Sequence, residues 1–200
     1  MANTVLKARY RAIKKILLKT GYRAIKKILK KFDRTACGLM RALDKDRQYF
    51  ALDSGDYVRA SSLELIANEI YDKKIDGSVA ELGVYRGDFA KIINEAFHDR
   101  KLYLFDTFEG FDERDVKLEL KNNYSTGEQD FSKTSVELVL NKMKHKKNCI
   151  VRKGYFPETI YGEGGNDLTN ERYAFVSIDV DLYEPMYKGL NYFYEKLTCE

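Results

Sequence analysis

The stretch VAELGVYRGDFAKIINEAF, residues 79–97, joins two different patterns of apolar residues. Its first part, VAELGV, is a short and nearly continuous apolar run, which is typical of a strand buried on both faces. Its second part carries apolar residues at the spacing of one helix face, namely Phe89, Ile92, Ile93, Ala96 and Phe97. The change of period predicts a strand that is followed directly by a helix.

The same alternation recurs along the chain. Further strand-like runs are LYLFDTF at 102–108, CIVRKGYF at 149–156 and YAFVSIDVD at 173–181. Strands that are apolar throughout and alternate with helical patterns form parallel sheets covered on both faces. The sequence therefore predicts an α/β, doubly wound, Rossmann-like domain with a mostly parallel sheet, in the strand order 3-2-1-4.

Local signals predict where three of the helices begin. Ser61-x-x-Glu64 and Thr134-x-x-Glu137 have the form of capping boxes. Pro185 is expected to start the helix that follows the fourth strand, because proline is favoured at the first helical position.

Residues 1–32 differ sharply in charge from the rest of the chain. They contain eleven of the 35 Lys and Arg residues and none of the 31 Asp and Glu residues, so the remainder carries 24 basic residues against 31 acidic ones. The octamer YRAIKKIL at 10–17 returns at 22–29, an offset of 12 residues. We expect residues 1–33 to form a basic amphipathic helical arm with this tandem repeat, and residues 34–200 to form the α/β domain.

Composition and charge indicate the cellular compartment of the protein and the kinds of partner it contacts. No apolar run approaches the roughly 18 residues needed to span a bilayer, and the basic start lacks the apolar core of a signal peptide. Three cysteines without metal-type spacing favour a reducing compartment, so we expect a cytoplasmic protein. The arm predicts peripheral contact with the anionic inner face of the membrane, which we rank above an organelle transit peptide. The acidic domain has no nucleic-acid-binding motif, so we expect no nucleic acid partner.

Ligands of such folds bind outside the carboxyl ends of the strands. Gly83 lets the backbone bend sharply after the first strand, and Gly87 allows close approach of a ligand or a helix. Glu81 would repel a phosphate but suits a cationic ligand such as the ammonium and sulfonium of S-adenosylmethionine. Asp106 ends the second strand 23 residues after Gly83, where an acid takes ribose hydroxyls. The alternative is that Glu81 is a buried structural acid and that Asp106 caps a helix or turn.

Five segments carry a family resemblance, and they occur in the order AELGVYRGDFA, LYLFDTFEGF, DFSKTSVELVLNKM, GYFPETI and FVSIDVDLYEPMYKGL. Together with DYVRASSLELIANEI at 56–70, they resemble the macrocin O-methyltransferase family of class I methyltransferases. This likeness runs from about Asp56 to Leu197 and leaves out the arm. It implies an enzyme that transfers a methyl group from S-adenosylmethionine to a hydroxyl, in this family that of a sugar in a glycan or glycosylated natural product.

The resemblance also implies roles for individual residues. It assigns S-adenosylmethionine to Glu81, Gly83, Tyr85 and Gly87, with Asp106 and Thr107 at the ribose and with Gly154 and Phe156 near the adenosyl pocket. It implies a Mg²⁺-dependent site in which Asp179 is both metal ligand and general base. A hard cation lowers the pKa of a sugar hydroxyl, and a nearby carboxylate can then accept its proton. Asp181 would point to the other face of the strand, and we expect it to support the site or to cap the next helix.

Four tyrosines remain open to two interpretations. Tyr155, Tyr161, Tyr183 and Tyr187 either line an acceptor pocket or pack within the domain.

The sequence departs from the family pattern after Leu197. Family members continue with further strands and an Asp pair that completes the metal site, whereas this sequence ends at Glu200. We therefore expect a C-terminally truncated domain whose fourth strand is an exposed apolar edge, unless a partner such as a second copy covers it. The alternative function is a non-catalytic domain that binds S-adenosylmethionine and is held at an anionic membrane by its arm.

Overall fold

Four parallel strands form the sheet of this computed structural model, which describes residues 57–127, 129–161 and 168–198. They are β1 (Ser78–Leu82), β2 (Leu102–Asp106), β3 (Cys149–Lys153) and β4 (Tyr173–Ile178), in the order β3-β2-β1-β4. The predicted strand order and the doubly wound α/β class are confirmed. The expected arm of residues 1–33, its repeat and its boundary with residues 34–200 lie outside the described residues.

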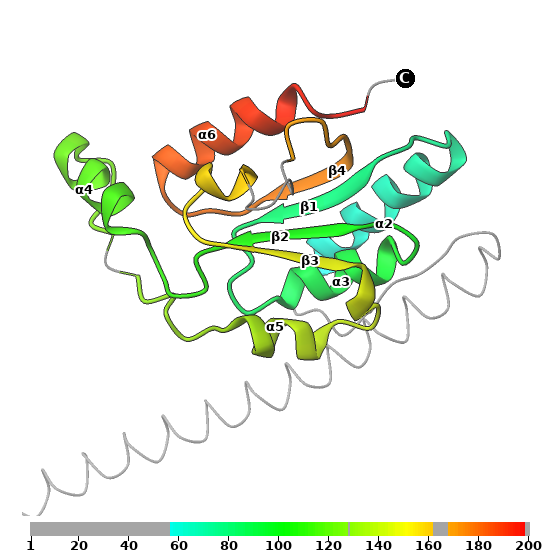
Figure 1. The fold of residues 1–200 in the computed structure, drawn as a ribbon, viewed down its shortest axis with the longest axis horizontal. Coiled ribbons are helices and arrows are strands. Elements are labelled where there is room, and N and C mark those ends of the chain that lie inside the picture. The colour runs from blue at the N-terminus through cyan, green and yellow to red at the C-terminus, as the bar shows by residue number, and fades with distance from the viewer. Residues whose placement is uncertain (1–56, 128, 162–167, 199–200) are drawn as a thin grey trace, which may run out of the picture. The chain divides into compact units, whose positions relative to one another are not determined.

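Helices cover both faces of the sheet. In Figure 1, α2 (Tyr57–Asp72), α3 (Asp88–Ala96) and α5 (Val136–Lys142) lie on one side, and α6 (Tyr183–Tyr194) lies on the other. The remaining helix, α4 (Glu113–Asn122), stands beyond the carboxyl ends of the strands, and two 3-10 turns lie at Lys146–Asn148 and Glu158–Ile160. Every residue of β1 is buried, because β1 has a strand on each side and helices on each face.

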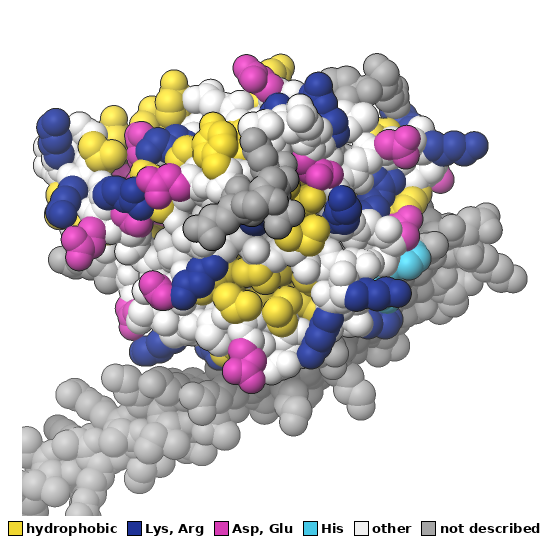
Figure 2. All heavy atoms as spheres, in the orientation of Figure 1, with side chains coloured by type: hydrophobic (Ala, Val, Ile, Leu, Met, Phe, Trp, Pro, Cys, Tyr) yellow, Lys and Arg dark blue, Asp and Glu magenta, His cyan; other side chains and the backbone are white. Residues whose placement is uncertain are grey.

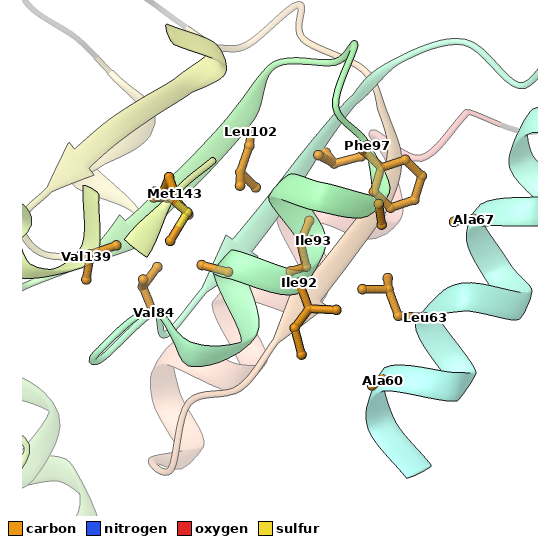
Figure 3. Close-up of a cluster of buried hydrophobic side chains, with 14 of the residues drawn as sticks. Ala60, Leu63, Ala67, Val84, Ile92, Ile93, Phe97, Leu102, Val139 and Met143 are labelled. Atoms are coloured by element: carbon orange, nitrogen blue, oxygen red, sulfur yellow. The ribbon is translucent and has the colours of Figure 1, made fainter. Parts of the chain in front are cut away.

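The larger part of the core lies between the sheet and the helices α2, α3 and α5. Figure 3 shows Leu63 of α2 pointing toward Ile92 and Ile93 of α3, and places Leu102 of β2 and Met143, the residue after α5, on the side of α3 away from α2. Leu63, Ile93 and Leu102 are almost completely buried. Each fully buried apolar side chain of this size contributes about 1.5–3 kcal/mol to stability, so these contacts orient α2 and α3 on the sheet.

Aromatic side chains fill the other face. The ring of Phe193 on α6 lies 5.1 Å from Tyr173, and 5.7 Å from both Phe105 and Phe156. All four side chains are buried. Edge-to-face and offset ring pairs at these distances are favourable beyond their buried area. Phe193 therefore anchors α6 to β2, to β4 and to the loop after β3.

Helix α2 begins earlier than predicted. It starts at Tyr57, so Ser61 lies inside the helix and is not its cap; the predicted capping box is wrong. The buried stripe of α2 already includes Ala60, one residue before Ser61. Packing of that extra turn against the core outweighs the local capping signal.

The start of α5 is shifted by one residue. Ser135, not Thr134, is the N-cap, and its side chain accepts a hydrogen bond from the backbone N–H of Leu138. Thr134 instead donates to the carbonyl of Tyr85 in the loop after β1. The capping box predicted at Thr134 is therefore wrong, because the Thr134 hydroxyl is engaged in a tertiary hydrogen bond.

The start of α6 also differs from the prediction. The helix begins at Tyr183, so Pro185 lies in its first turn and is not its first residue.

Helix α4 lies in a polar stretch where the sequence predicted no helix. Asp112 caps it by accepting from the N–H of Arg114, and Asn123 ends it in a left-handed conformation. Its buried residues are the acids Asp115 and Glu119. Because the buried face of α4 is acidic, hydrophobic periodicity could not reveal it.

The two edges of the sheet are β3 and β4. Hydrophobic side chains gather in the middle of the face seen in Figure 2, over the part of the molecule where Figure 1 shows β3. On the outer side of β4, Leu197 forms one parallel bridge with Tyr173. Among the residues that the structure describes, no helix combines the length and apolarity that crossing a membrane requires.

Candidate functional site

A cleft of about 370 Å³ opens at the carboxyl ends of the strands, where ligands of doubly wound folds bind. Eight of the nine residues predicted for the site line it: Glu81, Gly83, Tyr85, Asp106, Thr107, Gly154, Phe156 and Asp179. Gly87 is the ninth, and it is not among the lining residues. The fold thus brings four separate strand ends together, while the binding roles of these residues stay predictions.

The two glycines after β1 serve close backbone and helix packing. Gly83 has φ +88°, and a Cβ there would lie 2.3 Å from the carbonyl oxygen of Asp179. Gly87, with φ +73°, caps α3, and a Cβ there would lie 2.9 Å from a methyl group of Val139 on α5. The sequence predicted that Gly87 allows close approach of a ligand or of a helix, and the structure shows the close approach of helix α5.

Asp106 holds two loops at the floor of the cleft. Its carboxylate accepts hydrogen bonds from the backbone N–H of Tyr85 at 2.8 Å and of Phe108 at 2.7 Å. Tyr85 and Phe108 both have positive φ, so these bonds stabilise an unfavourable backbone. Asp106 therefore caps these two turns. A carboxylate has about four acceptor positions, so this role is compatible with a ligand, and the role of Asp106 at the ribose stays a prediction.

Glu81 is a buried carboxylate that faces the cleft. It is 1% exposed, and its Oε2 atom has no hydrogen-bond partner within the described part of the chain. Burial raises the pKa of Glu81 well above its usual value, Arg59 lowers it, and the nearby Asp179 and Asp106 raise it further. A cationic ligand would supply the missing partner, so this atom fits the ammonium-bearing part of S-adenosylmethionine.

Arg59 of α2 also enters the cleft, and the sequence did not indicate it. Its Nη2 atom lies 2.8 Å from Oδ2 of Asp179 and 3.9 Å from Oε1 of Glu81. Its guanidinium stacks on the ring of Phe89, with the carbon 3.8 Å from the ring centre. Arg59 lies in the segment 56–70 before the first strand, which shares the family resemblance but gave Arg59 no role, and the packing of α2 places it here.

A second polar cluster stands on the wall formed by α4 and α6. The hydroxyl of Tyr155 donates to Oδ1 of Asp115 at 3.1 Å and accepts from Nζ of Lys188 at 2.8 Å. The guanidinium of Arg114 lies over the Tyr155 ring at 3.6 Å. Burial raises the pKa of Asp115 and of Tyr155. Asp115 and Tyr155 line the cleft, and the sequence pointed only to Tyr155.

The described residues do not complete a Mg²⁺ site. Asp179 is 57% exposed and paired with Arg59, and Asp181 follows two residues later. Within 57–127, 129–161 and 168–198, no group of three or more His, Cys, Asp or Glu side chains is arranged to hold a metal. Mg²⁺ favours octahedral oxygen coordination, for which these two carboxylates are not enough. The metal role of Asp179 therefore stays a prediction, and no step below depends on it.

The family follows from a comparison of the whole chain. A family model described as macrocin-O-methyltransferase (TylF) matches residues 4–199. The chain belongs to the macrocin O-methyltransferase family. The match also includes most of residues 1–32, so the expectation that the arm lies outside the family likeness is wrong.

Solved structures agree on the fold. The chain is similar to a structure titled "Structure of the O-methyltransferase NovP", with 21% sequence identity and a TM-score of 0.50. The similar region covers 70% of this chain and 60% of that one, so this macrocin O-methyltransferase family member spans less than two thirds of NovP. No similar sequence was found among curated proteins.

Proposed function

We propose that this chain binds S-adenosylmethionine in the cleft and acts as an O-methyltransferase on a sugar hydroxyl. The observation that carries the proposal is the buried Glu81 carboxylate with an unpartnered oxygen, next to Asp106, in a member of the macrocin O-methyltransferase family. Methyl transfer is an in-line displacement, so the protein must hold the sulfonium methyl against the acceptor oxygen.

The charges of the cleft suit the cofactor. Glu81 lies in a poorly solvated position, where its attraction for the positively charged methionine part is stronger than in water. Asp106 can accept hydrogen bonds from the ribose hydroxyls in addition to those from the backbone. Gly154, which hydrogen-bonds to the carbonyl of Asp106, and the buried Phe156 extend the cleft along β3 for the adenosyl part.

Proton removal from the acceptor falls to Asp179. This carboxylate lies at the end of β4, lines the same cleft as Glu81, and is more than half exposed. A carboxylate beside the acceptor oxygen can take the proton as the new C–O bond forms.

Exposed tyrosines support a sugar acceptor. Tyr183 and Tyr187 are 51% and 54% exposed, and their rings are nearly parallel with centroids 6.1 Å apart. They follow Asp181 and Leu182, which line the cleft. An exposed aromatic surface beside a polar cleft suits the apolar faces of a sugar ring.

Calorimetry tests the cofactor part of the proposal directly. S-adenosylmethionine should bind the 200-residue chain, and at 100 times its dissociation constant it should stabilise the fold by about 2.7 kcal/mol. Glu81→Ala and Asp106→Ala should abolish binding, while Glu69→Gln, at an exposed position of α2, should bind normally. A folded chain that gives neither heat nor a thermal shift with the cofactor would contradict the proposal.

A second proposal concerns residues 1–32. We propose that this basic, acid-free segment attaches the protein to the anionic inner face of the membrane, either as an active enzyme or as a non-catalytic binding domain. Each Lys or Arg near such a surface contributes about 1 kcal/mol at low salt. Vesicles containing anionic lipid should bind the full chain in a salt-sensitive way and should not bind residues 33–200. Equal binding of both chains would refute attachment through this segment.

A further inference from the structure

The cleft places one buried negative group and one positive group side by side. Nη2 of Arg59 and Oε1 of Glu81 are 3.9 Å apart, and both residues line the cleft. The two come from α2 and β1, so the pair exists only in the folded chain. Such a pair is complementary to a ligand that carries both charges close together.

The guanidinium of Arg59 is held in a defined position. The ring of Phe89 lies on one of its faces at 3.8 Å, and the carboxylate of Asp179 lies 2.8 Å from its Nη2 atom. The Arg59 side chain is 34% exposed, so solvent reaches it from the cleft. A planar guanidinium fixed by stacking is well suited to recognise a carboxylate through two parallel hydrogen bonds.

An α-amino acid carries an ammonium and a carboxylate on the same carbon atom. We propose that Arg59 binds the α-carboxylate of the methionine part of S-adenosylmethionine, while Glu81 binds its α-ammonium. The inference rests on the proposed function, because it takes S-adenosylmethionine as the ligand. Arg59 is then a cofactor-binding residue that belongs to the helix before the first strand.

Binding of the cofactor carboxylate to Arg59 also affects Asp179. The cofactor carboxylate competes with Asp179 for the Arg59 guanidinium, since both are anions at the same group. Cofactor binding therefore weakens the Arg59–Asp179 ion pair and leaves the Asp179 carboxylate available to the acceptor hydroxyl. A purely structural Arg59 would stabilise Glu81 and Asp179 without recognising the carboxylate of the ligand.

Two ligands that differ only in the carboxylate separate these roles. S-adenosylhomocysteine carries the complete amino acid, and its decarboxylated form keeps the ammonium and adenosine but lacks the carboxylate. Calorimetry should be carried out with both ligands on the wild-type chain, Arg59→Gln, Arg59→Lys and Lys73→Gln. Lys73 is a matched control, because it is a cation next to the end of α2 that pairs with Glu69 outside the cleft.

The wild type should bind S-adenosylhomocysteine about 10- to 100-fold more tightly than the decarboxylated ligand, which is the usual effect of a hydrogen-bonded charge. Arg59→Gln should lose that preference by weakening S-adenosylhomocysteine alone, and Arg59→Lys should keep part of it. Lys73→Gln should behave like the wild type. Thermal melting of each variant shows whether it is folded.

Each other outcome overturns the inference. If the wild type binds both ligands equally, Arg59 has no carboxylate-binding role. This outcome is measured on the wild-type chain alone, so it does not depend on whether a variant folds. The same holds if Arg59→Gln weakens both ligands by the same factor. A folded wild-type chain that binds neither ligand refutes the proposed cofactor itself, and so separates failure of the function from failure of this inference.

Discussion

At the scale of single residues, Glu81 combines almost complete burial with a position in the lining of the cleft. Its carboxylate is buried at the end of β1, and burial raises its pKa well above the ordinary value of 4.5. A group whose pKa is raised in the folded state favours folding at low pH, and that contribution is lost as the pH rises through the folded-state pKa. The ionised form, which a cationic ligand requires, is therefore the form that destabilises the empty protein.

We predict that Glu81→Gln stabilises the chain without ligand at pH 8. The gain should be at least about 1 kcal/mol, which corresponds to about 2–4 °C in Tm for a chain of this size. It should shrink as the pH falls toward and below the ordinary pKa of 4.5, where the unfolded chain also takes up a proton on Glu81. Thermal melting of both proteins between pH 5 and pH 8 measures this difference, and a pH-independent difference would contradict it.

Gly83 sets the contact between β1 and β4. Its backbone lies so close to the carbonyl of Asp179 that a Cβ would be only 2.3 Å from the oxygen, and its φ is positive. Backbone atoms cannot move aside as a flexible side chain can. This position therefore tolerates no side chain while the two strand ends remain in place.

We predict that Gly83→Ala destabilises the fold by more than about 2 kcal/mol, because steric overlap adds to the backbone strain of about 1–2 kcal/mol. Gly127→Ala is the control, since Gly127 also has positive φ but its nearest neighbour is a methyl group of Val116 at 3.3 Å. Urea unfolding of both variants should show the larger loss for Gly83→Ala. Equal losses would mean that backbone strain alone decides both positions.

At the scale of elements, α4 and α6 are joined through a helix end. Glu119 of α4 is 2% exposed, and its carboxylate accepts from the backbone N–H of Tyr183, the first residue of α6. Its other oxygen accepts from the hydroxyl of Ser125 at 2.7 Å. The N-cap residue Leu182 has no side chain that can cap α6, so Glu119 does this from another helix.

We predict that Glu119→Ala destabilises the chain by about 1–3 kcal/mol, because it removes the acceptor of the Tyr183 N–H and of the Ser125 hydroxyl and leaves a gap at a buried position. Glu119→Gln keeps one acceptor oxygen and should cost less. The control is Glu113→Ala at an exposed position in the first turn of α4. Urea unfolding gives the three values, and hydrogen exchange at Tyr183 should accelerate only in the Glu119 variants.

At the scale of the whole molecule, stability is concentrated in the two central strands. All residues of β1 and four of the five in β2 are buried, whereas β3 and most of β4 are only partly buried. The two edge strands each lack a full neighbour on one side within the described residues. Opening of the edges therefore costs less free energy than opening of the centre.

We predict that hydrogen exchange followed by mass spectrometry protects β1 and β2 most strongly. Peptides covering β3 and β4 should exchange earlier, apart from Tyr173, whose N–H is bonded to the carbonyl of Lys196. Uniform protection of all four strands would show that the sheet opens only as one unit.

Local patterns in the sequence were enough for the sheet and for most of the cleft. Residues 79–97 carry their own change of period, so β1, its turn and α3 could be predicted. Parallel strands end at one edge of a sheet, and this placed Glu81, Asp106 and Asp179 together. The signals that failed were those of single capping residues, because packing starts α2 four residues before Ser61 and because Thr134 donates to the carbonyl of Tyr85.

The sequence by itself determined the α/β class, the strand order and the acids at the strand ends, because these depend on periodicity and on general rules of topology. Only the tertiary structure decided the partners of those acids. Arg59 reaches Glu81 and Asp179 because α2 packs on α3, and Glu119 reaches α6 because α4 folds against it. Such contacts join residues far apart in the chain, and no local pattern records a distance that arises only when helices pack.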